Sequence, residues 1–204
     1  FYPPHKNPHW VYITSLGASS LDYQLQIAKW LEENPDIKVA FQPGTFQMNA
    51  GYEKLGVFYR RAEIFFCNVE EAKRILKKGA NADGAENNAE SSVNNNVHNK
   101  NSKVKELMRE MHELGPKNIV ITDGPRGAYA FDGNENWFMP TYPDPKPPYE
   151  RTGAGDAFAS TVTSALALGK PPSEALSWRT INSRSVVQDI GAQRGLLKRD
   201  KIEE

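Results

Sequence analysis

Strand-like and helix-like segments alternate along most of this chain, and this alternation limits its fold more than any other feature. The strand-like segments are β-branched and aromatic, whereas the helix-like ones repeat apolar residues every three or four positions. The predicted strands are residues 10–16, 37–45, 62–68 and 118–124, and the predicted helices are residues 19–34, 69–79, 103–115, 156–168 and 173–188. This order favours an α/β fold in three layers, with a largely parallel sheet flanked by helices on both faces.

Residues 127–140 extend this pattern with a predicted β-hairpin. Its turn falls at Asp132, Gly133 and Asn134, which are residues typical of tight turns. Parallel sheets bind ligands beyond the carboxyl ends of their strands. Asn68 and the turn at residues 122–127 fall at such ends, so we expect a ligand site there.

A polar segment at residues 79–103 interrupts the alternation. It is rich in Asn, Ala, Ser and Gly and has almost no large apolar side chains, so it cannot bury enough surface to offset its ordering entropy. We interpret it as a mobile surface insertion. The 204 residues then form a single domain, residues 1–204.

Composition excludes several classes of protein. The chain balances 25 Lys and Arg against 25 Asp and Glu, which disfavours a nucleic-acid partner. Its single cysteine, Cys67, rules out a disulfide framework, and no apolar run reaches membrane-spanning length, so we expect a cytoplasmic protein without a membrane partner. His5 and His9 are four residues apart, but the prolines around them favour a solvated loop over a metal site.

The run Thr152-Gly153-Ala154-Gly155-Asp156 precedes an alanine-rich apolar helix. Glycines allow close backbone approach to a ligand, and the start of a helix adds unpaired N–H groups and the positive end of its dipole, so this run suits a phosphate. A carboxylate would repel phosphate, but beside one it could take a proton from an attacking hydroxyl. From spacing alone, Asp156 is equally well explained as a general base or as a helix cap.

The segment "RTGAGDAFAS" closely resembles the C-terminal signature of the ribokinase-like (PfkB) family of sugar and nucleoside kinases. The segments "NVEEAKRIL", "VITDGPRGAYAFDG" and "INSRSVVQDIGAQRG" resemble other family motifs in the same order, and the matches span most of residues 10–197. The resemblance implies a ribokinase-like fold and an ATP-dependent carbohydrate kinase that phosphorylates a hydroxymethyl group of a sugar. A nucleoside kinase and a non-catalytic nucleotide-binding relative are the alternatives.

The resemblance also implies roles for individual residues. Asp156 would be the catalytic base, and the amides of Gly153, Ala154 and Gly155 would stabilise charge on the transferring phosphoryl group. Asn68 and Glu71 would organise Mg²⁺ and the phosphates through water, although as a helix cap and a solvated carboxylate they need no ligand. The residues that would contact the nucleotide are Asn68, Glu71, Thr122, Gly124, Gly127, Thr152 and Asn182.

Several positions depart from the family pattern. Glu150 and Arg151 stand where many members carry Asp and Thr. Glu150 keeps the negative charge that helps some members bind a monovalent cation such as K⁺, but on a longer side chain. Arg151 either touches a nucleotide phosphate or lies on the surface. Gln42 replaces a common aspartate, and Asp123 replaces an uncharged or basic residue.

The strand, the Gly-Gly-x-x-x-Asn segment and the lid that open family members are absent from this sequence. We therefore expect the chain to hold the ATP side and the base but to lack most residues that choose the small-molecule sugar or nucleoside. A homodimer would form through the absent lid.

Overall fold

The computed structural model describes residues 1–77, 93–141 and 147–203, and the expectations for residues 79–92 lie outside it. The chain divides into two compact units, Phe1–Met139 and Pro140–Glu204. That the whole chain acts as one domain stays a prediction. In the described part of the chain, no helix combines the length and the apolar character that a membrane-spanning segment needs.

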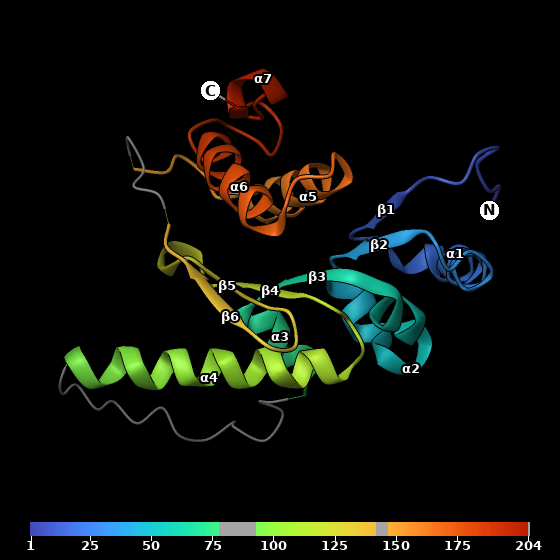
Figure 1. Ribbon diagram of the computed structural model, residues 1–204, viewed down its shortest axis with the longest axis horizontal. Helices are drawn as coiled ribbons and strands as arrows, with labels where there is room; N and C mark the ends of the chain where they lie inside the picture. Colours follow the sequence, from blue (N-terminus) through green and yellow to red (C-terminus); the bar gives the residue numbers. More distant parts are fainter. Residues whose placement is uncertain (78–92, 142–146, 204) are drawn as a thin grey trace. The chain divides into compact units, whose positions relative to one another are not determined.

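The first unit is built on a six-stranded, mostly parallel sheet (Figure 1). Strands β1 to β4 pair in parallel and in chain order, whereas β5 and β6 add to this sheet as antiparallel strands. The strands are β1 (Trp10–Ile13), β2 (Lys38–Phe41), β3 (Ala62–Asn68), β4 (Ile119–Thr122), β5 (Ala128–Phe131) and β6 (Asn136–Met139). This architecture confirms the predicted α/β class, and the hairpin of β5 and β6 confirms the predicted turn.

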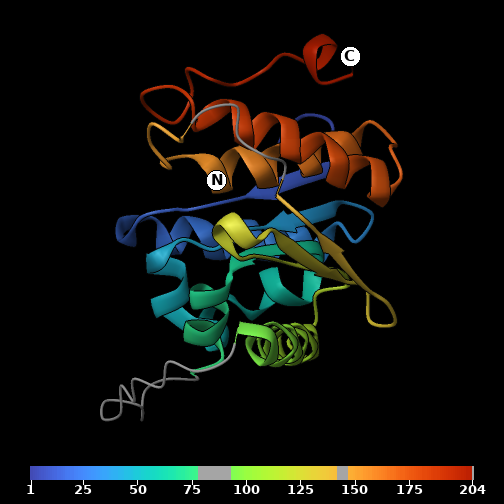
Figure 2. The ribbon, with the colours of Figure 1, turned by 90° about the vertical axis from the view of Figure 1, so that its left-hand side faces the viewer.

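Four helices of this unit cover the same face of the sheet (Figure 2). Parallel strands added in one direction by right-handed crossovers place every connecting helix on one side. Apolar side chains of these helices share a core with alternate strand residues such as Phe41, Phe65 and Ile121. The helices are α1 (Leu21–Glu33), α2 (Thr45–Arg61), α3 (Val69–Ile75) and α4 (Val93–Glu113), and two short 3₁₀ turns are η1 (Ala18–Ser20) and η2 (Gly124–Arg126).

Two helices differ from the sequence prediction. Helix α2 was not predicted, because Gly51 kinks it and polar residues alternate with apolar ones in its first turns. Leu55, Phe58 and Tyr59 anchor its second half in the core. Helix α4 (Val93–Glu113) begins ten residues before the predicted start, so the last part of the predicted mobile insertion, residues 93–103, is helical. The mobility of the insertion stays a prediction. The Asn-rich composition there concealed the helix, since asparagine has a low helix propensity.

The second unit consists of helices α5 (Ala154–Ala167), α6 (Pro172–Val186) and α7 (Arg199–Glu203). Helix α5 packs along α6, and buried residues such as Phe158, Val162 and Trp178 lie on these two helices. The predicted start of α5 at Asp156 was wrong by two residues, because Ala154 and Gly155 are already helical.

Candidate functional site

The carboxyl ends of β3 and β4 bring two of the sequence-predicted residues together. Asn68 ends β3, Thr122 ends β4, and the two are register partners in the parallel ladder. Gly124 and Gly127 follow in the turn after β4. Four predicted nucleotide-side positions therefore lie at one edge of the sheet, the edge at which parallel sheets bind ligands.

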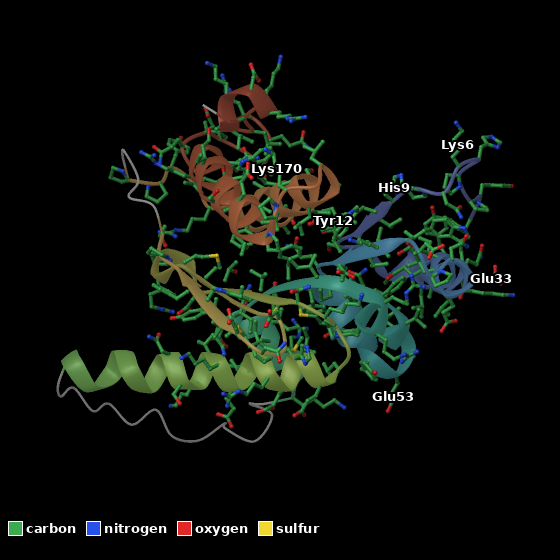
Figure 3. All side chains as sticks on the ribbon, in the orientation of Figure 1. Lys6, His9, Tyr12, Glu33, Glu53 and Lys170 are labelled. Atoms are coloured by element: carbon green, nitrogen blue, oxygen red, sulfur yellow. The ribbon has the colours of Figure 1, made fainter. Side chains whose placement is uncertain are left out.

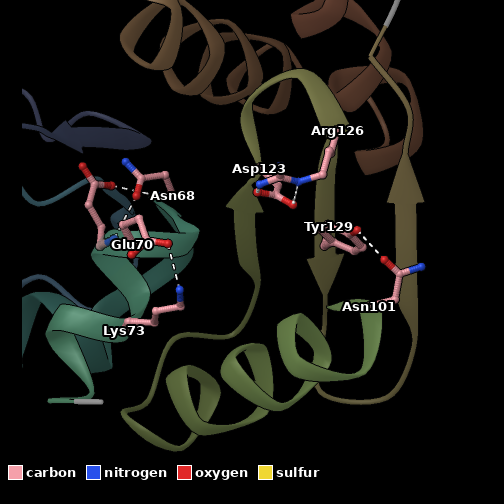
Figure 4. Close-up of polar contacts among 8 residues, drawn as sticks. Asn68, Glu70, Lys73, Asn101, Asp123, Arg126 and Tyr129 are labelled. Carbon is pink, nitrogen blue, oxygen red and sulfur yellow. Dashed lines mark hydrogen bonds and ion pairs between the residues drawn. The ribbon is translucent and has the colours of Figure 1, made fainter. Parts of the chain in front are cut away.

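Asn68 and Glu71 form a reciprocal capping box at the start of α3 (Figure 4). The Glu71 amide donates to Asn68 Oδ1 at 2.8 Å, and the Asn68 amide donates to Glu71 Oε2 at 2.8 Å. The box satisfies two amides at the start of the helix and fixes both side chains. The box uses Oε2 of the Glu71 carboxylate and the side-chain oxygen of Asn68, Oδ1.

Protein side chains alone do not build a metal centre in the described part of the chain. No three His, Cys, Asp or Glu side chains cluster there. Burial, followed by the nearby charge of Glu71, raises the pKa of the Cys67 thiol, which keeps it protonated and a poor metal ligand. His5 and His9 lie on the non-helical segment before β1, where Figure 3 labels His9, so they do not share a helix face.

The turn after β4 carries an ion pair within the predicted nucleotide loop (Figure 4). Arg126 Nε donates to Asp123 Oδ2 at 2.6 Å, and Arg126 Nη2 donates to Asp123 Oδ1 at 2.5 Å. The Asp123 amide also donates to the Gly127 carbonyl at 2.8 Å, which closes the turn. The carboxylate and the guanidinium therefore meet in a bidentate geometry within one hydrogen-bonded turn.

Buried glutamines hold the ends of β1 and β2. Gln47 is fully buried on α2. Its Nε2 donates to the Thr14 carbonyl at 3.1 Å and to Gln24 Oε1 at 3.0 Å. Its Oε1 accepts from the Gly44 amide at 2.7 Å. Tyr12 donates its hydroxyl proton to Gln42 Oε1 nearby. Sequence analysis missed Gln47, whose only signal was its place on a helix that was itself not predicted.

The first turn of α5 presents the predicted base and the predicted amides. Gly153 is the N-cap with φ 82° and ψ −6°, and Ala154, Gly155 and Asp156 are the first three helical residues. Asp156 is exposed and is not the N-cap residue. The first backbone N–H groups of a helix have no partner one turn earlier, and the Ala154 amide makes only a long bond of 3.3 Å to the Arg151 carbonyl.

A close backbone contact fixes the left-handed turn at Gly153. A Cβ atom at Gly153 would come within 2.5 Å of the Ala192 Cβ and 2.6 Å of its Cα. The segment after α6 therefore packs directly against the start of α5. The two resembling motifs, around residues 153 and 191, are adjacent in the second unit.

Glu150 is tied to the same segment. Hydrogen bonds from the Thr152 side chain and from the Gly191 amide lower the pKa of Glu150. The Gly191 amide lies 3.1 Å from Glu150 Oε2. The Glu150 carboxylate therefore accepts hydrogen bonds from both Thr152 and Gly191. Arg151, between Glu150 and Thr152, is exposed.

Asn182 is buried inside the second unit. Its Nδ2 donates to Thr161 Oγ1 at 2.7 Å, and its Oδ1 accepts from the Leu197 amide at 2.9 Å. The side chain thus joins α5, α6 and the segment before α7. Its predicted contact with the nucleotide stays a prediction.

Comparison with known families gives a match over most of the chain. Residues 53–199 match the model of the pfkB family carbohydrate kinases. This range contains the residues of the first unit from Asn68 to Gly127 and the whole first turn of α5.

Individual relatives point to two kinds of kinase. The chain is 34% identical to a ribokinase of Bacillus subtilis over 91 residues, and 32% identical to a cytidine kinase of Thermococcus kodakarensis over 131 residues. These matches cover 45% and 64% of this chain but only 30% and 39% of the relatives.

The fold is shared with a solved ribokinase of Cryptococcus neoformans in complex with ADP. The two structures superpose with a TM-score of 0.76 at 20% sequence identity, over 100% of this chain and 63% of that one.

Proposed function

The chain belongs to the pfkB family of carbohydrate kinases, and from this premise we propose that the complete protein transfers the γ-phosphoryl group of ATP to a hydroxymethyl group of a sugar. The observation that carries the proposal is the first turn of α5, where an exposed Asp156 follows a glycine N-cap and the first helical amides. A carboxylate next to an anion-binding turn suits a base that acts beside a phosphate.

Asp156 acts as the general base in this proposal. Its carboxylate accepts the proton of the acceptor hydroxyl as the hydroxyl oxygen forms a bond to the γ-phosphorus. The bond between that phosphorus and the β–γ bridging oxygen breaks, and ADP leaves. Proton acceptance at a positioned carboxylate contributes roughly 10²–10⁴-fold to such a rate.

The amides of Gly153, Ala154 and Gly155 would stabilise the charge on the transferring phosphoryl group. Phosphoryl transfer depends mainly on positioning and on electrostatic stabilisation by groups that are already oriented. The close packing of Gly153 against Ala192 supports a fixed orientation of this turn, because a Cβ at Gly153 would lie only 2.5 Å from the Ala192 Cβ. The dipole of α5, a helix of 14 residues, adds positive potential at the same place.

The nucleotide side of the proposed site is the edge formed by Asn68, Thr122, Gly124 and Gly127. Thr152 and Asn182 complete the set that the family motifs suggest. Oxygen donors suit Mg²⁺, which commonly takes one or two carboxylates together with phosphates and water, and the capping box leaves Glu71 an oxygen for such a role. When bound, Mg²⁺ would neutralise charge on the phosphates.

A nucleoside kinase is the second candidate. The observation in its favour is the match to the Thermococcus kodakarensis cytidine kinase, which covers more of this chain than the ribokinase match does. A nucleoside also presents a hydroxymethyl group, so Asp156 would have the same role with either acceptor.

A phosphorylation screen tests the proposal. The complete protein is incubated with ATP and Mg²⁺ and with single acceptors, namely ribose, several hexoses, cytidine and adenosine. ADP is measured by a coupled assay and the products by mass spectrometry. We expect acceptor-dependent ADP formation and a phosphorylated sugar. A phosphorylated nucleoside alone would support the second candidate, and folded protein that phosphorylates nothing would refute both.

A further inference from the structure

The loop between β4 and β5 carries a carboxylate within the nucleotide side of the proposed site. Asp123 lies between Thr122 and Gly124, which are two of the predicted nucleotide contacts. Two negative groups brought together in a partly dehydrated site repel each other strongly. A nucleotide loop that carries such an aspartate therefore needs a way to cancel its charge.

Arg126 supplies that cancellation in the structure. Its guanidinium meets both carboxylate oxygens of Asp123, at 2.6 and 2.5 Å. The Asp123 side chain is only 11% exposed, whereas the Arg126 side chain is 62% exposed, so the guanidinium covers the carboxylate from the solvent side. The same pair raises the pKa of Arg126, which keeps the guanidinium charged.

The loop holds this geometry through its own backbone. The Asp123 amide donates to the Gly127 carbonyl at 2.8 Å, and the Arg126 amide donates to the Asp123 carbonyl at 3.1 Å. Behind the loop, the Tyr129 hydroxyl donates to Asn101 Oδ1 of α4 at 2.7 Å, which ties β5 to that helix. The two charged side chains thus start from backbone positions that the turn fixes relative to each other.

We propose that Arg126 is a positioning residue for the nucleotide, which acts by masking the Asp123 carboxylate and not by binding phosphate itself. The proposal rests on the proposed function, because it takes the loop after β4 as part of the nucleotide site. The proposal predicts that loss of Arg126 weakens Mg·ATP binding only when residue 123 carries a negative charge.

A set of substitutions in the complete protein tests this prediction. Arg126→Met exposes the carboxylate, Asp123→Asn removes its charge, and the double variant does both. Lys117→Met is the matched control, because Lys117 pairs with Glu63 at 2.9 Å just before the amino end of the same strand. The dissociation constant of Mg·ATP is measured by calorimetry, kcat and KM by the acceptor assay, and folding by thermal unfolding.

Arg126→Met is expected to weaken Mg·ATP binding about tenfold through the uncovered charge, with KM for ATP following. Asp123→Asn and Lys117→Met should stay within about twofold of the natural protein, and the double variant should recover to within about threefold. The value of kcat should change little in all four, because the chemistry at Asp156 is untouched.

Two results would overturn the proposal. If the double variant binds as weakly as Arg126→Met, Arg126 contacts the nucleotide directly. If Arg126→Met binds like the natural protein, the pair has no bearing on the nucleotide. Failure of the proposed function looks different, because the unsubstituted protein would then bind no Mg·ATP, and the inference would fall with it.

Discussion

Replacing Gly153 by alanine should destabilise the second unit more than the same replacement at Gly169. Both glycines have left-handed backbones, with φ of 82° and 79°, and they lie at opposite ends of α5. A Cβ at Gly153 would meet the Cβ of Ala192 at 2.5 Å, whereas a Cβ at Gly169 would meet no atom within 4 Å. The comparison therefore separates steric overlap from backbone strain.

The expected magnitudes follow from these two terms. Left-handed backbone at a residue with a side chain costs roughly 1–2 kcal/mol, which both variants incur. Forcing an extra methyl group into a packed contact adds roughly 1–3 kcal/mol at Gly153 alone. Gly153→Ala should then lose roughly 2–5 kcal/mol of unfolding free energy, and Gly169→Ala roughly 1–2 kcal/mol.

Chemical denaturation followed by circular dichroism measures both losses, provided that the slopes of the transitions agree. The second unit should also show a lower thermal midpoint in Gly153→Ala. Equal losses in the two variants would mean that the segment around Ala192 yields freely. In that case Gly153 does not hold the start of α5 in the fixed geometry on which the anion-binding turn depends.

Three further predictions concern single polar side chains. The Arg61 guanidinium donates to the backbone carbonyls of Asn34, Pro35 and Ile37, which follow α1, at 3.2, 3.0 and 2.9 Å. Arg61→Met should therefore lower the free energy of unfolding, measured by urea titration, by about 1.5–3 kcal/mol. Asn182→Ala leaves Thr161 and the Leu197 amide without their partner, and about 1–3 kcal/mol should be lost in the same assay. The pKa of Glu150 is lowered from 4.5 in the folded protein, so its ionised carboxylate stabilises the fold above pH 4.5. This stabilisation is lost as the pH falls through the lower pKa of the folded state. Glu150→Gln should therefore remove this part of the acid dependence of the thermal midpoint.

The sequence predicted the elements whose signals are local. Residues 62–68 were assigned as a strand with both ends correct, because an apolar aromatic run stops at the helix-capping Asn68. The turn at Asp132 was predicted because Asp, Gly and Asn favour it, and Asp132 Oδ1 indeed accepts from the amides of Asn134 and Glu135 at 2.8 and 2.7 Å.

What the sequence could not predict depends on contacts between distant residues. Helix α2 forms because its second half enters the core, while its first half is held by Gln47, which bonds to Thr14 and Gln24 on other elements. No local pattern identifies such a network. The role of Arg61 at the end of α1 was hidden for the same reason, because its partners lie 24 to 30 residues earlier.

In the candidate site too, features set by local sequence were predicted, whereas contacts between separate side chains were not. The glycines and Asp156 stand in one short motif, so their proximity could be read from the chain. The alternation of elements predicted a largely parallel sheet, but not that β3 and β4 are neighbours in it, so the register pairing of Asn68 with Thr122 came only from the structure. The pairing of Asp123 with Arg126 was found only from the side-chain geometry, since a separation of three residues does not by itself establish a contact.

The most direct test of the central claim is the turnover of Asp156→Asn in the complete protein, with saturating ATP and the best acceptor. Asp200→Asn is the control, because Asp200 is also exposed in the first turn of a helix of the same unit. If Asp156 is the base, kcat falls by roughly 10²–10⁴ while the affinity for Mg·ATP and the unfolding midpoint stay unchanged. The control should keep its full rate. Turnover near that of the natural protein in Asp156→Asn would contradict the account.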